Sequence, residues 1–356
     1  MKLSANPTST IIRSLALSGW SASPKVPSAR SVRKVLLAIL TCAAGVSPVW
    51  AQIGPSGGET DHLSFAILGN TRPPVQDDAA GYPTAIIGRI YQDIQNYVPR
   101  PDFAIDTGTY MFAGIDHVPG TQGTQIDDYL QARNQFSNIL FPALGDHECT
   151  GATADNCGTN TNLVSSTNTN WSNYTNNNPK VPYPTTENYV AFKNSLLSPV
   201  KQSLPYYTIN ISSNSHPAQW TAKFVFVACN AWSTAQANWL NSQLAVPTTY
   251  TFVVRNEPSD ANTAPCLSLA GDLNADAIMH SYPYTLLIAG FTGEYAYSAS
   301  EKEVVVGNGG APLTTSADYG YVIATLQPNG NFLFTAYDYL TNKEVGSFTV
   351  GPSGPE

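Results

Sequence analysis

Short apolar segments, each ending in a glycine or a polar turn, alternate along the first half of this chain with segments of helical periodicity. The apolar segments predict strands over residues 63–68, 103–107 and 139–144, and the periodic segments predict helices over 82–98 and 122–138. Such alternation is typical of β-α-β units with parallel strands, which carry functional loops at the strands' carboxyl ends. The pattern therefore predicts an α/β protein with candidate site residues just beyond each strand.

The second half continues the alternation and then changes to strands alone. A helix is predicted over residues 234–245, and a Pro328-Asn329-Gly330 turn is predicted between two of the later strands. Strands are predicted over residues 206–211, 223–228, 250–254, 284–289, 303–306, 319–326, 331–339 and 345–350. The last part of the chain is therefore expected to consist of strands alone.

The first 51 residues contain six Lys or Arg residues and no acidic residue. An apolar run over 35–46 follows the basic part, and Val49-Trp50-Ala51 resembles a small-residue cleavage site. The run is shorter than the roughly 20 residues that cross a bilayer. We therefore expect a signal peptide over 1–51, a single secreted or periplasmic domain over 52–356, and no stable membrane insertion.

The charge of the chain excludes one class of partner. The whole chain has 17 basic and 25 acidic residues, a net charge of −8. Without the six basic leader residues, 11 basic and 25 acidic residues remain, a net charge of −14. Such an acidic domain is not expected to bind nucleic acid or an anionic membrane as its main partner.

Four cysteines remain after the leader: Cys149, Cys157, Cys229 and Cys266. An even number in an exported domain predicts two disulfides. Pairing of Cys149 with Cys157 would close a short loop, and pairing of Cys229 with Cys266 would tie a strand end to a later loop. Three pairings are possible, and a zinc site is an alternative although no CxxC pair occurs.

Residues 150–185 are rich in Asn, Thr and Ser and almost lack aliphatic side chains. This composition predicts a long surface insertion or lid. Trp171 and Tyr174 within it either fix the insertion in place or contact a ligand. The insertion also suggests one function class, an extracellular structural or adhesion protein that uses it for contacts.

Gly145-Asp146-His147-Glu148 follows the apolar segment 139–144 and places a carboxylate, an imidazole and a second carboxylate in successive positions. These groups suit acid–base or metal chemistry. Four further strand ends share the pattern, at Asn70, Thr109, Asn256 and Phe291. In this order the segments resemble the motifs D-x-H, G-D, G-N-H-E/D, H-x-P and G-H-x-H of the calcineurin-like metallophosphoesterases, which include the purple acid phosphatases.

The resemblance extends over most of residues 62–350. Gln236, Trp239 and Leu240 are similar to the family's Q-x-x-W-L helix. The resemblance implies a four-layer αββα sandwich of two mixed β-sheets flanked by helices. It also implies a site in which two metal ions, about 3.5–4 Å apart, clamp a phosphoryl group and generate the attacking hydroxide.

This chain departs from the family at the metal-ligand positions. Asn70 stands at the first Asp, and Thr109 stands at the bridging Asp. Asn256, Phe291 and Gly293 stand at later histidines. A threonine hydroxyl lacks the charge of a bridging carboxylate, and Phe and Gly side chains cannot ligate. We therefore expect a pseudoenzyme that retains the scaffold and binds a phosphate-type ligand or a protein partner without a cofactor.

Two arginines make an anion site one interpretation of the pocket. Arg72 and Arg255 lie at strand ends, and guanidinium groups bind phosphate without cations. Asn70, Thr109 and Asn256 would complete this site. Both arginines also fit a structural role, paired with an acidic residue at position 106, 146 or 257.

A rebuilt mononuclear metal site is the other interpretation. Asp106, Asp146 and Glu257, with His147, could hold Zn, Fe, Mn or Ca. The chain would then be an active phosphatase or phosphodiesterase. His147 matches the family histidine that assists phosphoryl transfer and would be catalytic.

Overall fold

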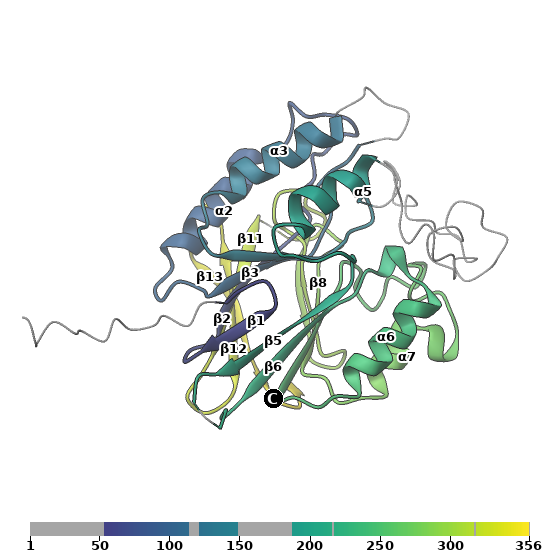
Figure 1. Cartoon of the computed structure of the whole chain (residues 1–356). Coiled ribbons are helices and arrows are strands. Elements are labelled where there is room, and N and C mark those ends of the chain that lie inside the picture. The colour runs from purple at the N-terminus through teal and green to yellow at the C-terminus, as the bar shows by residue number, and fades with distance from the viewer. Residues whose placement is uncertain (1–52, 114–120, 149–186, 216, 317, 356) are drawn as a thin grey trace, which may run out of the picture. The chain divides into compact units, whose positions relative to one another are not determined.

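Two seven-stranded sheets form the centre of the computed structural model, which describes residues 53–113, 121–148, 187–215, 217–316 and 318–355 (Figure 1). The first sheet has the order β1 (Gly57–Thr60), β5 (Tyr207–Ser213), β6 (Thr221–Phe226), β7 (Tyr250–Val254), β8 (Leu286–Ala289), β10 (Glu303–Val306), β9 (Tyr295–Ser298). The second sheet has the order β14 (Gly354–Pro355), β13 (Glu344–Gly351), β12 (Phe332–Asp338), β11 (Gly320–Leu326), β2 (Ser64–Leu68), β3 (Phe103–Asp106), β4 (Ile139–Pro142).

Both sheets are mixed, as the resemblance to the metallophosphoesterases implied. In the second sheet β2, β3 and β4 are parallel, whereas β11 pairs antiparallel with β2. In the first sheet β6, β7, β8 and β10 are parallel, whereas β5 pairs antiparallel with β6. Parallel strands end at the same edge of their sheet, so the strand ends singled out in the sequence are brought together.

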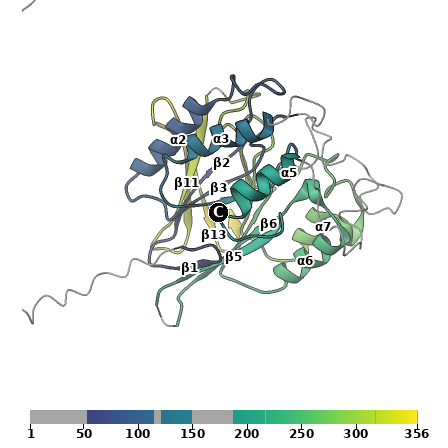
Figure 2. The ribbon, with the colours of Figure 1, turned by 45° about the horizontal axis from the view of Figure 1, so that its top comes forward.

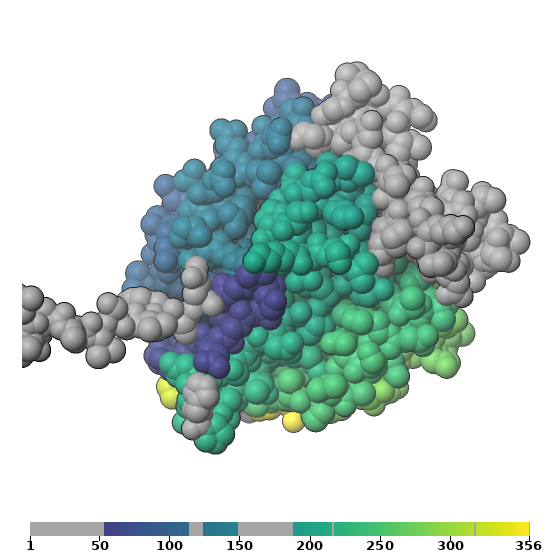
Figure 3. Space-filling model, in the orientation of Figure 1, coloured from purple at the N-terminus to yellow at the C-terminus, as the bar shows by residue number. Residues whose placement is uncertain are grey.

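Helices lie on the outer faces of the two sheets. They are α2 (Thr84–Asn96), α3 (Thr121–Arg133), α5 (Glu187–Phe192) with its π-helical continuation η1 (Lys193–Leu197), α6 (Thr234–Leu244) and α7 (Ala275–His280), with 3-10 turns η2 (Cys229–Ala231) and η3 (Gly271–Leu273). Figures 1 and 2 show α2 and α3 beside β3 and β11, and α6 and α7 on the other side of the molecule. In the space-filling view α5 packs against α3 (Figure 3). The predicted α/β class with two mixed sheets is confirmed.

Aromatic side chains join the sheets. Phe65 of β2 contacts Phe224 of β6 and Phe252 of β7, with ring centroids 5.0 and 5.5 Å apart. All five residues of β2 are buried, because strands in a sheet covered on both faces have no solvent side. The core therefore lies between the two sheets. It fixes the polar carboxyl ends of their strands relative to one another.

Several predictions fall outside the described residues. These are the signal peptide over 1–51, the insertion over 150–185, and Cys149 and Cys157. The described residues belong to one compact unit, Trp50–Glu356. Within them, every helix is too short or too polar to cross a membrane.

Candidate functional site

Backbone hydrogen bonds draw the strand ends together. The Asn70 amide N–H donates to the Gly108 carbonyl over 2.9 Å, which joins the ends of β2 and β3. The Gly290 amide N–H donates to the Asn256 carbonyl over 2.8 Å, which joins the ends of β7 and β8. Asn256 also crosses between the sheets, since its Nδ2 donates to the Thr107 carbonyl over 2.9 Å. The predicted strand-end residues therefore form one cluster.

Thr107 explains two of the motif glycines. A Cβ atom on Gly69 or on Gly290 would lie 1.8 Å from Thr107 Oγ1. Thr107 is fully buried, and its hydroxyl donates to the Val306 carbonyl over 3.3 Å. Only glycine allows the backbone to approach so closely on both sides of one side chain.

Asn70 and Thr109 have left-handed backbone conformations, with φ of 55° and 65°. This region costs non-glycine residues about 1 kcal/mol or more, and most of all a β-branched residue. Strained residues of this kind cluster at functional sites when the surrounding contacts hold them. The outliers here are the two strand ends where the resemblance places metal-binding carboxylates.

The centre of the site is a hydrogen-bonded chain of three side chains. The Thr109 hydroxyl donates to Asp146 Oδ1 over 3.0 Å, and Asn256 Nδ2 donates to Thr109 Oγ1 over 3.1 Å. All three residues are buried. His147 lies beside them, with its Nε2 atom 3.6 Å from Asp146 Oδ2 and its ring centroid 4.7 Å from that of Phe112.

Glu148 organises the loops around this chain. Its carboxylate accepts the backbone N–H groups of Thr109, Tyr110, Met111 and Gly145, over 2.9, 2.7, 3.3 and 2.8 Å. Burial and the neighbouring Asp146 raise the pKa of Glu148 to about 8, while the backbone N–H groups oppose this shift. The second carboxylate of the motif therefore holds two strand ends and is not available to a ligand.

Arg72 lies at the site, as the anion interpretation requires. Its guanidinium carbon is 4.8 Å from the centroid of the Phe112 ring that also contacts His147. Its Nη1 donates to the Pro73 carbonyl over 3.1 Å. Burial lowers the pKa of Arg72, and the charge of Asp146 opposes this shift. One cationic group, one carboxylate and one imidazole are thus gathered near Phe112.

Arg255 does not join them. It is fully buried, and all three guanidinium nitrogens find protein acceptors. The acceptors are the Glu257 carbonyl at 2.6 Å, Asp276 Oδ1 at 2.6 Å and Ser259 Oγ at 3.3 Å. This geometry fits the structural alternative, with Asp276 as the partner in place of the three carboxylates that the sequence suggested.

The four residues of the rebuilt metal site are not grouped as ligands. Asp106 accepts from the Tyr129 hydroxyl over 2.6 Å, and burial raises its pKa to about 7. Glu257 Oε1 accepts from the amide of Asn230, and burial raises the pKa of Glu257 to about 8. Across the described residues, no three His, Cys, Asp or Glu side chains are placed to hold a metal ion.

The residues at the later histidine positions of the family, Phe291 and Gly293, also cannot serve as metal ligands. A Cβ on Gly293 would lie 2.1 Å from the Pro312 carbonyl oxygen, so no side chain fits there. Phe291 is anchored by its backbone N–H, which donates to the Asn256 carbonyl over 2.7 Å. The donor set of the described residues therefore does not fit a dinuclear metal centre.

Asn230 is a site residue that the sequence did not single out. It lies in η2, just after β6, and next to Cys229. The structure confirms the Cys229–Cys266 disulfide, with an S–S distance of 2.03 Å. The strand over 223–228 that precedes Asn230 was the available signal, because its end faces the same edge as β7.

Two buried oxygens of the site have no hydrogen-bond partner within the described structure. They are Asn70 Oδ1 and Glu257 Oε2, in residues that are 3% and 2% exposed. Buried polar atoms are normally satisfied by protein, water or ligand. Both atoms therefore lack the partner that burial normally requires.

Comparison with known proteins establishes the fold. No protein-family model and no curated protein sequence matches this chain. Among solved structures it is similar to the purple acid phosphatase PPD1 of yellow lupin (Lupinus luteus), with a TM-score of 0.55 and 15% identity, over 84% of this chain and 55% of the lupin chain. It is also similar to GAP50, described as the anchor in the inner membrane complex of Plasmodium, with a TM-score of 0.50 and 15% identity, over 82% and 89% of the two chains.

The chain therefore has the calcineurin-like metallophosphoesterase fold. It spans little more than half of the lupin enzyme. At this identity the similarity concerns the fold alone, and the function has to be argued from the site.

Proposed function

We propose that this protein is an exported pseudoenzyme that binds a phosphate-type anion at the strand ends and does not hydrolyse phosphoric esters through a dinuclear metal centre. The observation that carries the proposal is the chain of hydrogen bonds through Thr109, Asp146 and Asn256. The hydroxyl and amide groups there form hydrogen bonds with neighbouring side chains. A dinuclear metal centre needs ionised carboxylates and free imidazoles at these positions instead.

The residues at the site suit a hydrogen-bonded anion. Arg72 supplies a positive charge on Phe112, the ring that His147 also contacts, and guanidinium groups bind phosphate oxygens through paired N–H donors. The unpartnered oxygen of Asn70 is an acceptor, whereas burial raises the pKa of Glu257 to about 8, so its protonated carboxyl can also donate. A monoprotonated phosphate or a phosphate ester with a nearby hydroxyl offers both acceptors and donors, so it can satisfy both kinds of group.

The fold is not confined to proteins named as phosphatases. GAP50, which shares it, is described as an anchor. Partner binding by this chain would be consistent with that precedent. Export is part of the proposal and is supported by the basic leader, the apolar run over 35–46 and the Cys229–Cys266 disulfide.

Titration with inorganic phosphate by calorimetry tests the anion site. We expect saturable binding by the native protein and at least about tenfold weaker binding by Arg72→Ala, since a charge-assisted pair of hydrogen bonds contributes on the order of 1.5–3 kcal/mol. Arg100→Ala is the matched control, because Arg100 is exposed and bonds only to Ser137 among the described residues. Absence of heat, or equal loss in both variants, would contradict the anion site.

Metal analysis and an aryl-phosphate assay test the pseudoenzyme assignment. We expect substoichiometric Zn, Fe, Mn and Ca in the purified protein, and no turnover after any of these metals is added. A stoichiometric metal together with turnover that His147→Ala abolishes would establish the hydrolase interpretation instead.

A further inference from the structure

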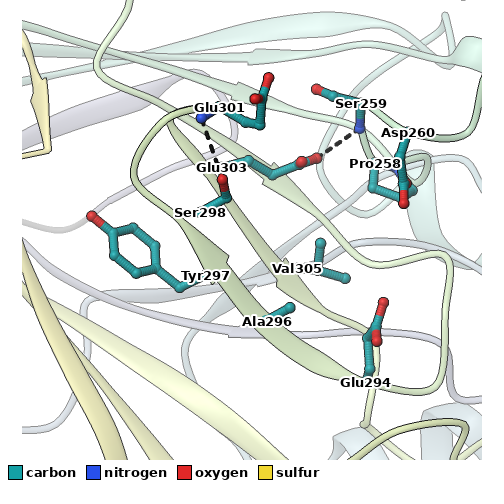
Figure 4. Close-up of a pocket in the computed structure, with 10 residues that line it drawn as sticks. All are labelled: Pro258, Ser259, Asp260, Glu294, Ala296, Tyr297, Ser298, Glu301, Glu303 and Val305. Atoms are coloured by element: carbon teal, nitrogen blue, oxygen red, sulfur yellow. Dashed lines mark hydrogen bonds between the residues drawn. The ribbon is translucent and has the colours of Figure 1, made fainter.

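A cavity of about 400 Å³ opens between β9, β10 and the segment that follows β7 (Figure 4). Its volume falls within the range of small-molecule sites, which is roughly 300–1,000 Å³. Four carboxylates line it, from Asp260, Glu294, Glu301 and Glu303, and Tyr297 lies beside them. No Lys, Arg or His lines this cavity among the residues that the structure describes.

Arg255, which lies behind the cavity wall, offsets the charge of these carboxylates only in part. Arg255 forms its ion pair with Asp276 over 2.6 Å and donates to Ser259 Oγ in the cavity wall. The cavity therefore keeps a negative potential, which low-dielectric walls strengthen. A cation fits this potential, and a phosphate-type anion does not.

Glu303 is the most buried of the four cavity carboxylates. Glu303 is only 7% exposed, and its Oε1 accepts the Ser259 backbone N–H over 2.9 Å. The second carboxylate oxygen has no hydrogen bond or ion pair within the described structure. Burial raises the pKa of Glu303 to about 7, with Asp260 and Asp276 adding to the shift and Arg255 opposing it. Because Arg255 only partly offsets the effect of burial, a bound cation would further stabilise the ionised carboxylate.

The carboxylates are spread along the cavity. Figure 4 shows Glu294 at one end and Glu301 and Glu303 toward the other. No three acidic side chains of the described structure are grouped closely enough to hold a metal ion. This spacing suits several cationic groups on one extended molecule better than a single metal ion.

Two walls of the cavity are fixed in position. Glu294 Oε1 accepts the Thr292 hydroxyl over 2.7 Å, and the Thr315 hydroxyl bonds to Glu294 Oε2. Tyr297 stacks on Phe348 with ring centroids 3.6 Å apart. A fixed carboxylate and a fixed aromatic ring are both suitable partners for an alkylammonium group.

We propose that this cavity binds a linear aliphatic polyamine, with one ammonium group at Glu303 and another at Glu294. The methylene chain between them packs against Tyr297 and Val305, which line the same cavity. The proposal does not depend on phosphate binding at the strand ends.

Calorimetric titration with spermidine at low ionic strength tests the proposal. We expect saturable binding that weakens as salt is added, because partly exposed charge pairs are screened. Glu303→Gln should weaken binding by about tenfold or more, since the amide keeps the acceptor for Ser259 and removes the charge. Glu344→Gln removes the same charge from an exposed position on β13, and its affinity should stay within about twofold of the native value.

Two further measurements complete the test. Should Glu303→Gln fail to fold by circular dichroism, Asp260→Asn replaces it, with an expected loss of about threefold because Asp260 is exposed. Titrations in two buffers of different ionisation enthalpy should show proton release at pH 7 as Glu303 ionises. No heat with 1 mM spermidine, equal affinity of the cavity variant and its control, or complete displacement of spermidine by equimolar Ca²⁺ or Mg²⁺ would overturn the assignment.

Discussion

Asn256 shows how a single residue changes role within a shared scaffold. Its side-chain amide donates to the Thr107 carbonyl and to Thr109 Oγ1, and its backbone carbonyl accepts the N–H groups of Gly290 and Phe291. It therefore links three strand ends from both sheets. The resemblance places a metal-binding histidine there, whereas the amide makes the same cross-sheet connection by hydrogen bonds alone.

Asn256→Ala should lower the free energy of unfolding by about 2–3 kcal/mol, because two buried acceptors lose their donor. Urea denaturation measures this change. Asn241→Ala is the control, since Asn241 is exposed and bonds to the Tyr282 hydroxyl at the surface, and it should shift stability by less than about 0.5 kcal/mol. Equal effects of the two substitutions would contradict the cross-sheet role.

Sequence reasoning predicted the residues of the site better than their partners. The clustering of Asn70, Thr109, Asp146 and Asn256 follows from strand ends, which apolar segments mark clearly. Asp276 as the partner of Arg255 could not be predicted, because it lies in α7, a helix of six residues. Such a short helix gives no periodic signal, and Asn274 caps it by accepting the Ala277 N–H over 3.0 Å.

Elements with strong local patterns matched the structure closely. The strand predicted over 250–254 is β7, and the helix predicted over 234–245 is α6 with one residue fewer at its end. The helix predicted over 82–98 is shorter, Thr84–Asn96, because Pro83 occupies its N-cap and Tyr97 is extended. Strands β1 and β9 and helix α5 were missed, since each is short and depends on tertiary contacts.

The disulfide joins two structural elements, because it connects η2, which follows β6, to the segment before α7. Cys229 and Cys266 are separated by 37 residues. A closed loop of this size stabilises the folded state by roughly 3–4 kcal/mol in the chain-entropy model. Cys229→Ala with Cys266→Ala should therefore lower the denaturation midpoint, and reductant should lower the native protein to a similar midpoint without affecting the double variant. A loss below about 1 kcal/mol would show that packing alone holds this segment.

Among the described residues, five carboxyl groups have pKa values that burial raises to about 6 or higher. Burial raises the pKa of Asp102 to about 6, of Asp106 and Glu303 to about 7, and of Glu148 and Glu257 to about 8. The folded protein then holds protons at pH values where the unfolded chain has released them. Because the unfolded state binds fewer protons, stability must fall as pH rises through this range.

We expect the free energy of unfolding to fall continuously between pH 5 and pH 8, by at least about 3 kcal/mol, since each unit of pKa shift corresponds to about 1.4 kcal/mol. Urea denaturation at pH 5, 6.5 and 8 and constant ionic strength measures the slope. Asp106→Asn should show a shallower slope because one contributing group is gone. A stability that rises toward pH 8 would contradict the assignment of buried, protonated carboxyl groups.

The order of the strands in the two sheets could not be predicted from the periodicity of the sequence. β11 lies beside β2 through pairs such as Val322 with Ile67, residues far apart in the chain. Local patterns cannot specify such a pairing, and the two-sheet arrangement was expected only through resemblance to a known family.

Thr107, held between Gly69 and Gly290, bears on how proteins of this kind are recognised from their sequences. The two glycines are required by the contact between the sheets, whichever reaction the site performs. A chain can therefore exchange every catalytic group and still display the glycines by which a pattern search identifies an enzyme. In this architecture, the survival of a motif's glycines measures the integrity of the frame, and only the residues between them report on chemistry.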